Sequence, residues 1–195
     1  MDNITDLAGP FAWLALILYT NALLAQVVHE LAHAALPLLD QKRDGKRYVI
    51  RVRSFRGPFL FRRVNPAGTS WELGLVPGFG EANVTERWQV TYPRRAIAAV
   101  LLGPFANILT GLALAIPLVR VFGFYDGYEM AITALLWPTP TGLMWSWMVH
   151  MCLISLFAGI GNLVLIVPRK SDGSRLIGLL LRLRRRRPPR SNRAA

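Results

Sequence analysis

The most informative segment of the 195-residue chain is residues 10–36, PFAWLALILYTNALLAQVVHELAHAAL. About 20 predominantly apolar residues suffice for a helix to cross the hydrocarbon core of a bilayer. Pro10 suits a first helical turn, and Pro37, which follows the segment directly, predicts the end of the helix. We therefore expect residues 10–36 to form a membrane-spanning helix whose polar side chains lie mainly in its second half.

Two further apolar segments predict additional spans at about residues 96–119 and 142–167. Met130–Trp137 is apolar but too short to cross alone. Hydrophobic residues make up 53% of the chain, above the 45–50% typical of soluble domains. Cys152 is the single cysteine, so an intrachain disulfide is excluded. The composition therefore excludes a soluble globule and a disulfide scaffold, and predicts an all-α integral membrane protein.

The basic residues predict the topology of the three spans. The formal net charge is +12, and of 23 Lys and Arg residues 12 lie within 42–95 and 10 lie from Arg169 onward. Short cytoplasmic segments of membrane proteins are enriched in Lys and Arg. We therefore expect a multi-pass protein of the cell membrane with the N-terminus outside and the C-terminus cytoplasmic. Topology explains the charge, so no nucleic-acid partner is expected.

The loop between the first two predicted spans, residues 40–95, contains strand signals. Tyr48–Phe55 alternates apolar and basic residues, and short apolar runs follow at 59–61 and 73–76. We expect a small β-insertion lying against the membrane face. Residues 1–175 would form the core, and 176–195 a basic amphipathic tail. The tail favours an anchor to anionic lipid over a specific protein partner.

The segment His29-Glu30-Leu31-Ala32-His33 matches the H-E-x-x-H motif on a predicted helix. Side chains four residues apart share a helical face, so both imidazoles can reach one metal ion. Glu30 lies about 100° round the helix, where its carboxylate can serve in proton transfer. The alternative is a hydrogen-bonded polar cluster inside the bundle. Ionisable residues within a membrane span usually mark function, which favours a metal site.

A catalytic zinc site needs a third protein ligand and an open position for water. His150 is the only other histidine, and its distance from the end of the third span places it in the opposite half of the membrane. Asp172 lies just past the cytoplasmic end of that span, on the side where the first span delivers His29 and His33. The alternative for Asp172-Gly173 is an ordinary turn.

These features together resemble the site-2 proteases, a family of intramembrane zinc metalloproteases. Besides H-E-x-x-H, Gly103-Pro104-Phe105-Ala106-Asn107 is similar to the family's Gly-Pro-x-x-Asn segment. Asn162 through Pro168 to Asp172-Gly173 resembles its Asn…Pro…Asp-Gly motif, and Gly74–Gly80 its Gly/Pro-rich loop. The spacing from Asn162 to Asp172 is longer than is usual in the family, and Ser171 stands where Leu is common.

The resemblance implies an activity and a role for each site residue. His29, His33 and Asp172 would hold Zn²⁺, and Glu30 would be the catalytic acid and base. Asn107 and Asn162 would bind the substrate, a transmembrane segment of a membrane protein cleaved near the cytoplasmic leaflet. An edge strand, from residues 48–55 or 73–84, would pair with the unwound substrate.

Two other functions remain open at this point. The first is a membrane-bound zincin acting on soluble or misfolded proteins, in which a Glu usually supplies the third ligand. The second is a non-catalytic metal-binding membrane adaptor that recruits a partner through its basic face.

Overall fold

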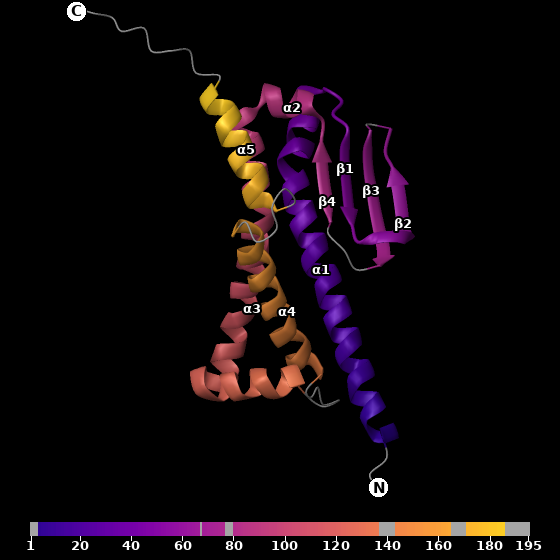
Figure 1. Ribbon diagram of the computed structural model, residues 1–195, viewed down its shortest axis with the longest axis vertical. Helices are drawn as coiled ribbons and strands as arrows, with labels where there is room; N and C mark the ends of the chain where they lie inside the picture. The colour runs from indigo at the N-terminus through magenta and orange to yellow at the C-terminus, as the bar shows by residue number, and fades with distance from the viewer. Residues whose placement is uncertain (1–3, 67, 77–79, 137–142, 165–170, 186–195) are drawn as a thin grey trace, which may run out of the picture.

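Long apolar helices make up most of the chain, and a small sheet is inserted between the first two of them (Figure 1). The computed structural model describes residues 4–66, 68–76, 80–136, 143–164 and 171–185. The elements are α1 (Ile4–Asp44), β1 (Ile50–Ser54), β2 (Arg56–Val64), β3 (Thr69–Val76), β4 (Glu81–Val84), α2 (Glu86–Thr91), α3 (Pro93–Leu136), α4 (Leu143–Leu163) and α5 (Asp172–Arg185).

Within these residues three helical segments are long and apolar enough to cross a membrane, namely Gly9–Asp44, Pro93–Val121 and Met144–Leu163. They overlap the three predicted spans, although the first is longer than predicted. Helix α1 begins at Ile4, so the prediction that Pro10 lies in the first helical turn is wrong. Residue 142 and residues 165–167 of the third predicted span lie outside the described residues. Pro168, residues 77–79 and the tail residues 186–195, which the sequence analysis also singled out, lie outside them as well.

The prediction that Pro37 ends the first helix is wrong. Helix α1 continues to Asp44 with Pro37 buried inside it. Proline removes one backbone hydrogen bond from a helix, but neighbouring elements can stabilise the turns beyond it. Here the carboxylate of Asp40 accepts hydrogen bonds from Trp88 Nε1, at 3.1 Å, and from the Arg95 guanidinium. These tertiary contacts hold the last turns of α1 in helical form.

Helix α3 is broken at Gly123, where φ is +67°. An L-residue with a side chain rarely adopts this backbone conformation, so glycine suits the break. The spanning part of α3 ends at Val121, and the segment after Gly123 turns away from it (Figure 1). This second segment contains most of the stretch 130–137 that the sequence predicted to be too short to cross alone.

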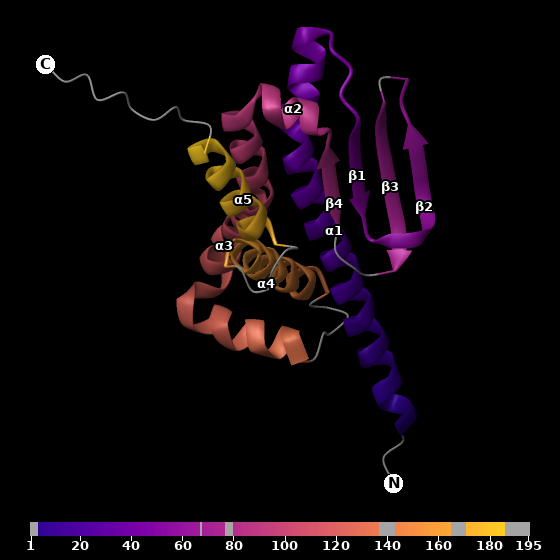
Figure 2. The same cartoon turned by 45° about the horizontal axis from the view of Figure 1, so that its top comes forward.

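The four strands form a mixed sheet in the order β2-β3-β1-β4. Strand β1 pairs in parallel with β3 and antiparallel with β4, while β2 and β3 are antiparallel. The sheet lies on the side of α1 away from α3, α4 and α5 in both views (Figures 1 and 2). Because β1 and β3 are interior strands, the prediction of an edge strand at 48–55 is wrong, and within 73–84 only the part that forms β4 lies at an edge. The edges are β2 and β4.

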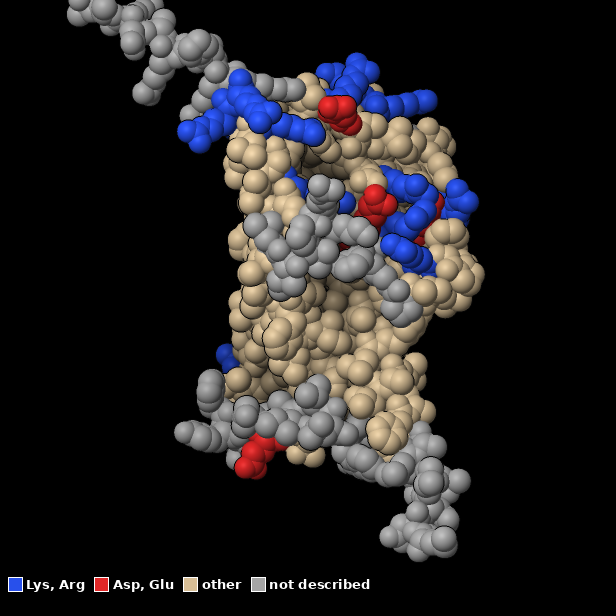
Figure 3. All heavy atoms as spheres, viewed as in Figure 1, with Lys and Arg blue, Asp and Glu red and all other residues tan. Residues whose placement is uncertain are grey.

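Charged side chains are unevenly distributed over the surface. On the face shown in Figure 3, Lys and Arg gather over the sheet and at the end of the molecule formed by α2 and the C-terminal part of α5. The helical surface below them is almost free of charge on this face. The described basic residues of the loop 42–95 and of α5 therefore lie toward the same end of the molecule.

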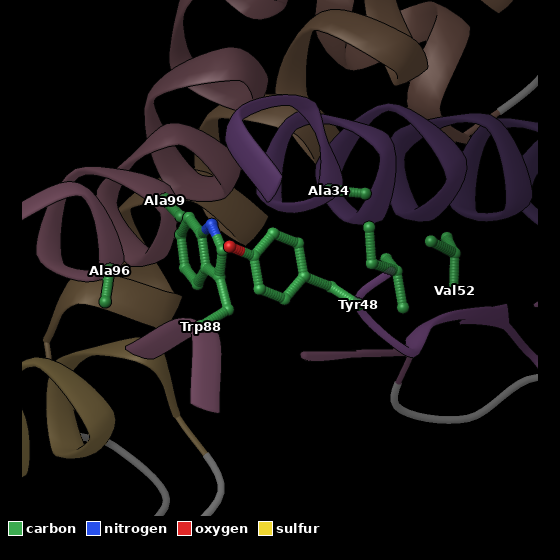
Figure 4. Close-up of a cluster of buried hydrophobic side chains, with 7 residues drawn as sticks. Ala34, Tyr48, Val52, Trp88, Ala96 and Ala99 are labelled. Carbon is green, nitrogen blue, oxygen red and sulfur yellow. The ribbon is translucent and has the colours of Figure 1, made fainter. Parts of the chain in front are cut away.

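A hydrophobic cluster joins the sheet to the helices on the same end of the molecule. Its buried members are Ala34, Tyr48, Ile50, Val52, Trp88, Ala96 and Ala99. The rings of Trp88 and Tyr48 point toward one another between α1 and α3 (Figure 4). This cluster, which we call the Trp88 cluster, fixes the sheet, α2 and the start of α3 against the second half of α1.

Candidate metal centre

Three predicted ligands converge at one buried point. His29 and His33 lie four residues apart on α1, and their Nε2 atoms are 3.0 Å apart. Asp172 is the first residue of α5, and its Oδ2 lies 2.9 Å from His29 Nε2 and 3.2 Å from His33 Nε2. All three residues are at most 6% exposed. The predicted convergence is therefore confirmed, and the group could hold a metal ion.

The spacing of these donor atoms suits a small tetrahedral ion. Zinc binds nitrogen and carboxylate oxygen at about 2.0–2.2 Å, so two ligands at a tetrahedral angle lie roughly 3.3 Å apart. The three observed separations of 2.9, 3.0 and 3.2 Å fall slightly below this value. Two imidazoles and one carboxylate also leave a fourth position open, as catalytic zinc sites do. The residues present could therefore hold a small tetrahedral metal ion.

Asp172 is held as an anion. Burial raises the pKa of its carboxyl group, but hydrogen bonds from His29 and His33 outweigh burial and bring this pKa below its usual range. A carboxylate must be deprotonated to bind a metal ion. The surroundings of Asp172 thus favour the form that a ligand requires.

The orientation of His33 is set by the backbone of α3. His33 Nδ1 lies 2.7 Å from the carbonyl oxygen of Ala99. A carbonyl only accepts, so Nδ1 carries a proton, and Nε2 can bind a metal ion once it releases the proton that it donates to Asp172. Gly103, one turn further along α3, lies so close that a Cβ atom there would overlap the imidazole. The glycine of the 103–107 segment is therefore required by the close approach of His33.

Asn107 contacts the other histidine. Its Nδ2 lies 3.3 Å from His29 Nδ1, and its Oδ1 is buried without a hydrogen-bond partner. Amide nitrogen and oxygen have nearly the same shape, so a half-turn of the amide places Oδ1 on this ring nitrogen. Nδ1 of His29 then donates its proton and Nε2 is free to bind metal. The structure thus places Asn107 beside a ligand, although its predicted role was to bind substrate.

Glu30 lies beside the three ligands with one oxygen engaged and one free. Its Oε1 accepts a hydrogen bond from Gln26 Nε2 at 2.6 Å, whereas Oε2 is buried and has no partner. Leaving a buried carboxylate oxygen unpaired costs free energy, so it marks a place for water or another polar group. Gln26 was not singled out from the sequence, although its position four residues before Glu30 was a signal.

Strand β4 begins next to this carboxylate. A Cβ atom at Gly80, which precedes β4, would overlap the side chains of Gln26 and Glu30. A cavity of about 280 Å³ extends from His33 along Ala82, Asn83 and Val84 and is closed on its other side by α5. One of the three ligands, His33, therefore lines a cavity that runs along the edge strand of the sheet.

Asn162, the other residue predicted to bind substrate, and His150, which was predicted to lie away from the site, form no hydrogen bond with this group. Asn162 is half-buried in the last turn of α4 and forms no hydrogen bond with the ligands or with Glu30. His150 is buried, its Nδ1 lies 2.7 Å from the carbonyl oxygen of Ser146, and it is not among the clustered ligands. Among the described residues no Glu joins His29 and His33 as a third metal ligand.

No model of a known protein family matches the chain, and no curated protein is recognisably similar to it. The function must therefore be argued from the residues and the geometry of the site.

Proposed function

We propose that the protein is an intramembrane zinc endopeptidase of the site-2 protease type. The observation that carries the proposal is the buried group of His29, His33 and Asp172 with the free oxygen of Glu30 beside it. Two of the three ligands and Glu30 belong to a helix long and apolar enough to cross a membrane. In this proposal the basic end of the molecule faces the cytoplasm.

In hydrolysis, Glu30 would transfer the proton and Gln26 would orient the carboxylate of Glu30. When bound, zinc would polarise the scissile carbonyl and acidify water. Glu30 Oε2 would take a proton from the attacking water as its oxygen bonds to the carbonyl carbon. The same carboxyl group would then give that proton to the amide nitrogen as the C–N bond breaks. Gln26 would hold the other oxygen of Glu30 and so fix the direction of the carboxylate.

The substrate would be a transmembrane segment of another protein, unwound at the scissile bond. A helical backbone hides its carbonyl groups, whereas an extended segment can add to the exposed edge of a sheet. Strand β4 offers such an edge beside the cavity that leads to His33. Its backbone would align the substrate, and the cavity would receive side chains next to the scissile bond.

The geometry argues against the zincin alternative, in which a Glu supplies the third ligand. Within the loop between the first two candidate spans, the buried carboxylate of Glu72 accepts hydrogen bonds from Arg51 and Arg53. Asp172 would complete the ligand set without any Glu. The adaptor alternative would use the same metal-binding residues as the protease but would not cleave a substrate. The experiment below tests for cleavage and so separates the two.

The test compares wild type with Glu30→Gln, expressed at equal levels in the membrane of the same host. New peptide termini inside apolar segments of membrane proteins are identified by mass spectrometry. We expect such termini with wild type and a loss of at least 100-fold in Glu30→Gln, because the general base contributes roughly 10²–10⁴-fold. The purified variant should keep its zinc, since Glu30 is not a ligand.

A matched control is Glu86→Gln, which makes the same chemical change on an exposed residue of α2. It should cleave as wild type does. Cleavage retained by Glu30→Gln would overturn the assignment of Glu30. Bound zinc without any cleavage by wild type would favour the adaptor.

A further inference from the structure

Helix α5 has a second apolar face that nothing in the described part of the chain covers. On one side, Leu179 packs against the Trp88 cluster and Leu183 is half-buried. On the other side, Ile177, Leu180 and Leu181 form a stripe at spacings of three and four residues, and they are 45–50% exposed. A surface helix of a globular protein needs only one apolar face, which packs against the core. The second apolar face of α5 would be buried only by another apolar environment.

The charges of α5 are segregated along its length. Arg182, Arg184 and Arg185 are exposed in its last turn, whereas its one acidic residue, Asp172, is buried in its first turn. Residues 186–195 add four further Arg and no acidic residue. Cations at a helix C-terminus also occur on solvated helices. Combined with an exposed apolar stripe one turn earlier, they form the pattern of a helix whose apolar face contacts lipid acyl chains and whose basic end reaches the headgroups. Helix α5 runs lengthwise beside α3 (Figure 1), so its two ends lie at different depths.

The position of α5 agrees with this pattern. Its 14 residues span about 21 Å, which is too short for a hydrocarbon core of about 30 Å. Arg182 lines a shared cavity with Pro93, the first residue of the second candidate span. The arginines therefore lie at the level where that span begins, near the cluster of basic residues in Figure 3. The stripe lies one turn deeper.

We infer that the Ile177-Leu180-Leu181 face of α5 docks in an anionic leaflet, with Arg182, Arg184 and Arg185 on lipid headgroups, and that this docking holds Asp172 at the metal centre. The second part rests on the proposed function. Asp172 is the first residue of the same short helix, so a displacement of α5 moves the carboxylate away from His29 and His33. Anionic lipid would thus regulate metal affinity and, through it, proteolysis.

The size of the effect follows from the arginines. A basic residue near an anionic surface strengthens binding by about fivefold. Three of them give an effect on the order of 100-fold on the docking equilibrium. We expect zinc affinity to rise between 10-fold and 100-fold when neutral lipid is replaced by anionic lipid.

The first measurement determines the depth of α5. Full-length protein with Leu181→Cys, labelled with a fluorophore, is reconstituted in nanodiscs of phosphatidylcholine with 30% phosphatidylglycerol. The native Cys152 is buried, and the protein without the added cysteine gives the background. Lipids brominated on their acyl chains should quench the probe at 181 but not one at Lys46→Cys, an exposed loop position. Equal, weak quenching at both positions would overturn the docking.

The second measurement tests the coupling to the metal centre. Zinc dissociation constants are compared in neutral and anionic nanodiscs for wild type, R182Q/R184Q/R185Q and K42Q/K46Q/R47Q. The last variant loses the same charge from exposed residues outside α5. We expect only the α5 variant to lose the response to anionic lipid. A zinc affinity independent of lipid in wild type would overturn the coupling.

The two proposals fail in different ways. Absence of zinc from wild type in every lipid would overturn the protease proposal and the coupling, while quenching at position 181 would still support the docking. Bound zinc and cleavage without quenching at 181 would overturn the docking and leave the protease proposal standing.

Discussion

Two buried carboxylates, Asp172 and Glu72, are equally hidden from solvent but are compensated in different ways. Each residue is 5% exposed. Glu72 accepts hydrogen bonds from Arg53 Nε, at 2.7 Å, and from Arg51 Nη2, at 3.1 Å. Asp172 instead faces the Nε2 atoms of two histidines. Arginine is permanently charged and cannot bind a metal ion, whereas neutral imidazole can.

The difference separates a structural carboxylate from a carboxylate suited to a metal centre. Glu72 joins β3 to its neighbour β1, and its partners are themselves partly exposed, with side-chain exposures of 41% for Arg51 and 27% for Arg53. Both partners of Asp172 are buried, and all three groups offer lone pairs to one point. Burial of an acidic residue is thus uninformative until its partners are known.

The largest expected effect is on bound metal. Asp172→Ala should lower zinc affinity by more than the 10–100-fold that is typical of losing an outer hydrogen-bond partner, because it removes a ligand. Glu72→Ala should leave affinity unchanged. Zinc per chain, measured on detergent-purified protein, distinguishes them, with about one ion expected for wild type. Full zinc in Asp172→Ala would move the third ligand elsewhere.

A smaller loss of zinc affinity is expected from substitutions of Asn107, which contacts the ligand His29 but is not itself a ligand. Asn107→Leu removes the amide that contacts His29 Nδ1 and should weaken zinc binding by about 10–100-fold. Asn107→Asp keeps an oxygen at the same place and should retain most of the affinity. Competition with a chromophoric chelator measures both constants. Equal affinities for wild type and Asn107→Leu would show that Asn107 does not orient His29.

The smallest expected effect concerns the stability of the sheet. Glu72→Gln should lower the free energy of unfolding by about 1–3 kcal/mol, because it weakens charge-assisted hydrogen bonds to Arg51 and Arg53. Burial raises the pKa of Glu72, but the hydrogen bonds from Arg53 and Arg51 outweigh burial and lower it overall. Its stabilising contribution is therefore complete above about pH 4.3, the ordinary value for Glu. It is lost as pH falls through the lowered pKa.

Thermal unfolding at pH 7 and at progressively lower pH checks this prediction. The difference between wild type and Glu72→Gln should shrink as the medium is acidified. A difference that stays constant down to pH 3 would mean that the charge of Glu72 contributes nothing to the stability of the folded state.

The ligands could be predicted from the sequence because their geometry is local or follows from topology. The spacing of His29 and His33 alone places them on one helical face. The position of Asp172 near them follows from the side of the membrane on which the third predicted span ends. The role of Asn107 could not be predicted in this way. The spacing of residues along α3 does not show that Asn107 contacts His29. That contact depends on the close approach of α3 to α1 at Gly103, which is set by tertiary packing.

The sheet shows the same division between local and long-range information. The alternation at Tyr48–Phe55 correctly predicted a strand. Whether that strand lies at an edge depends on its pairing with β3 and β4, which are distant in sequence. Pro37 is a third example, since a strong local signal for helix termination is overridden by the contacts of Asp40 with Trp88 and Arg95.

The contact between His33 and Ala99 has a consequence for mutational robustness. The acceptor for His33 is a main-chain carbonyl, so no single substitution at position 99 can delete it, although a larger side chain would disturb the packing there. His29 contacts a side chain as well as the backbone of Gly103, and one codon change at position 107 removes the side-chain contact. Under random mutagenesis, substitutions at position 107 should therefore loosen His29 while its main-chain contact persists, whereas His33 has no such side-chain contact with the described residues of α3 to lose to a substitution.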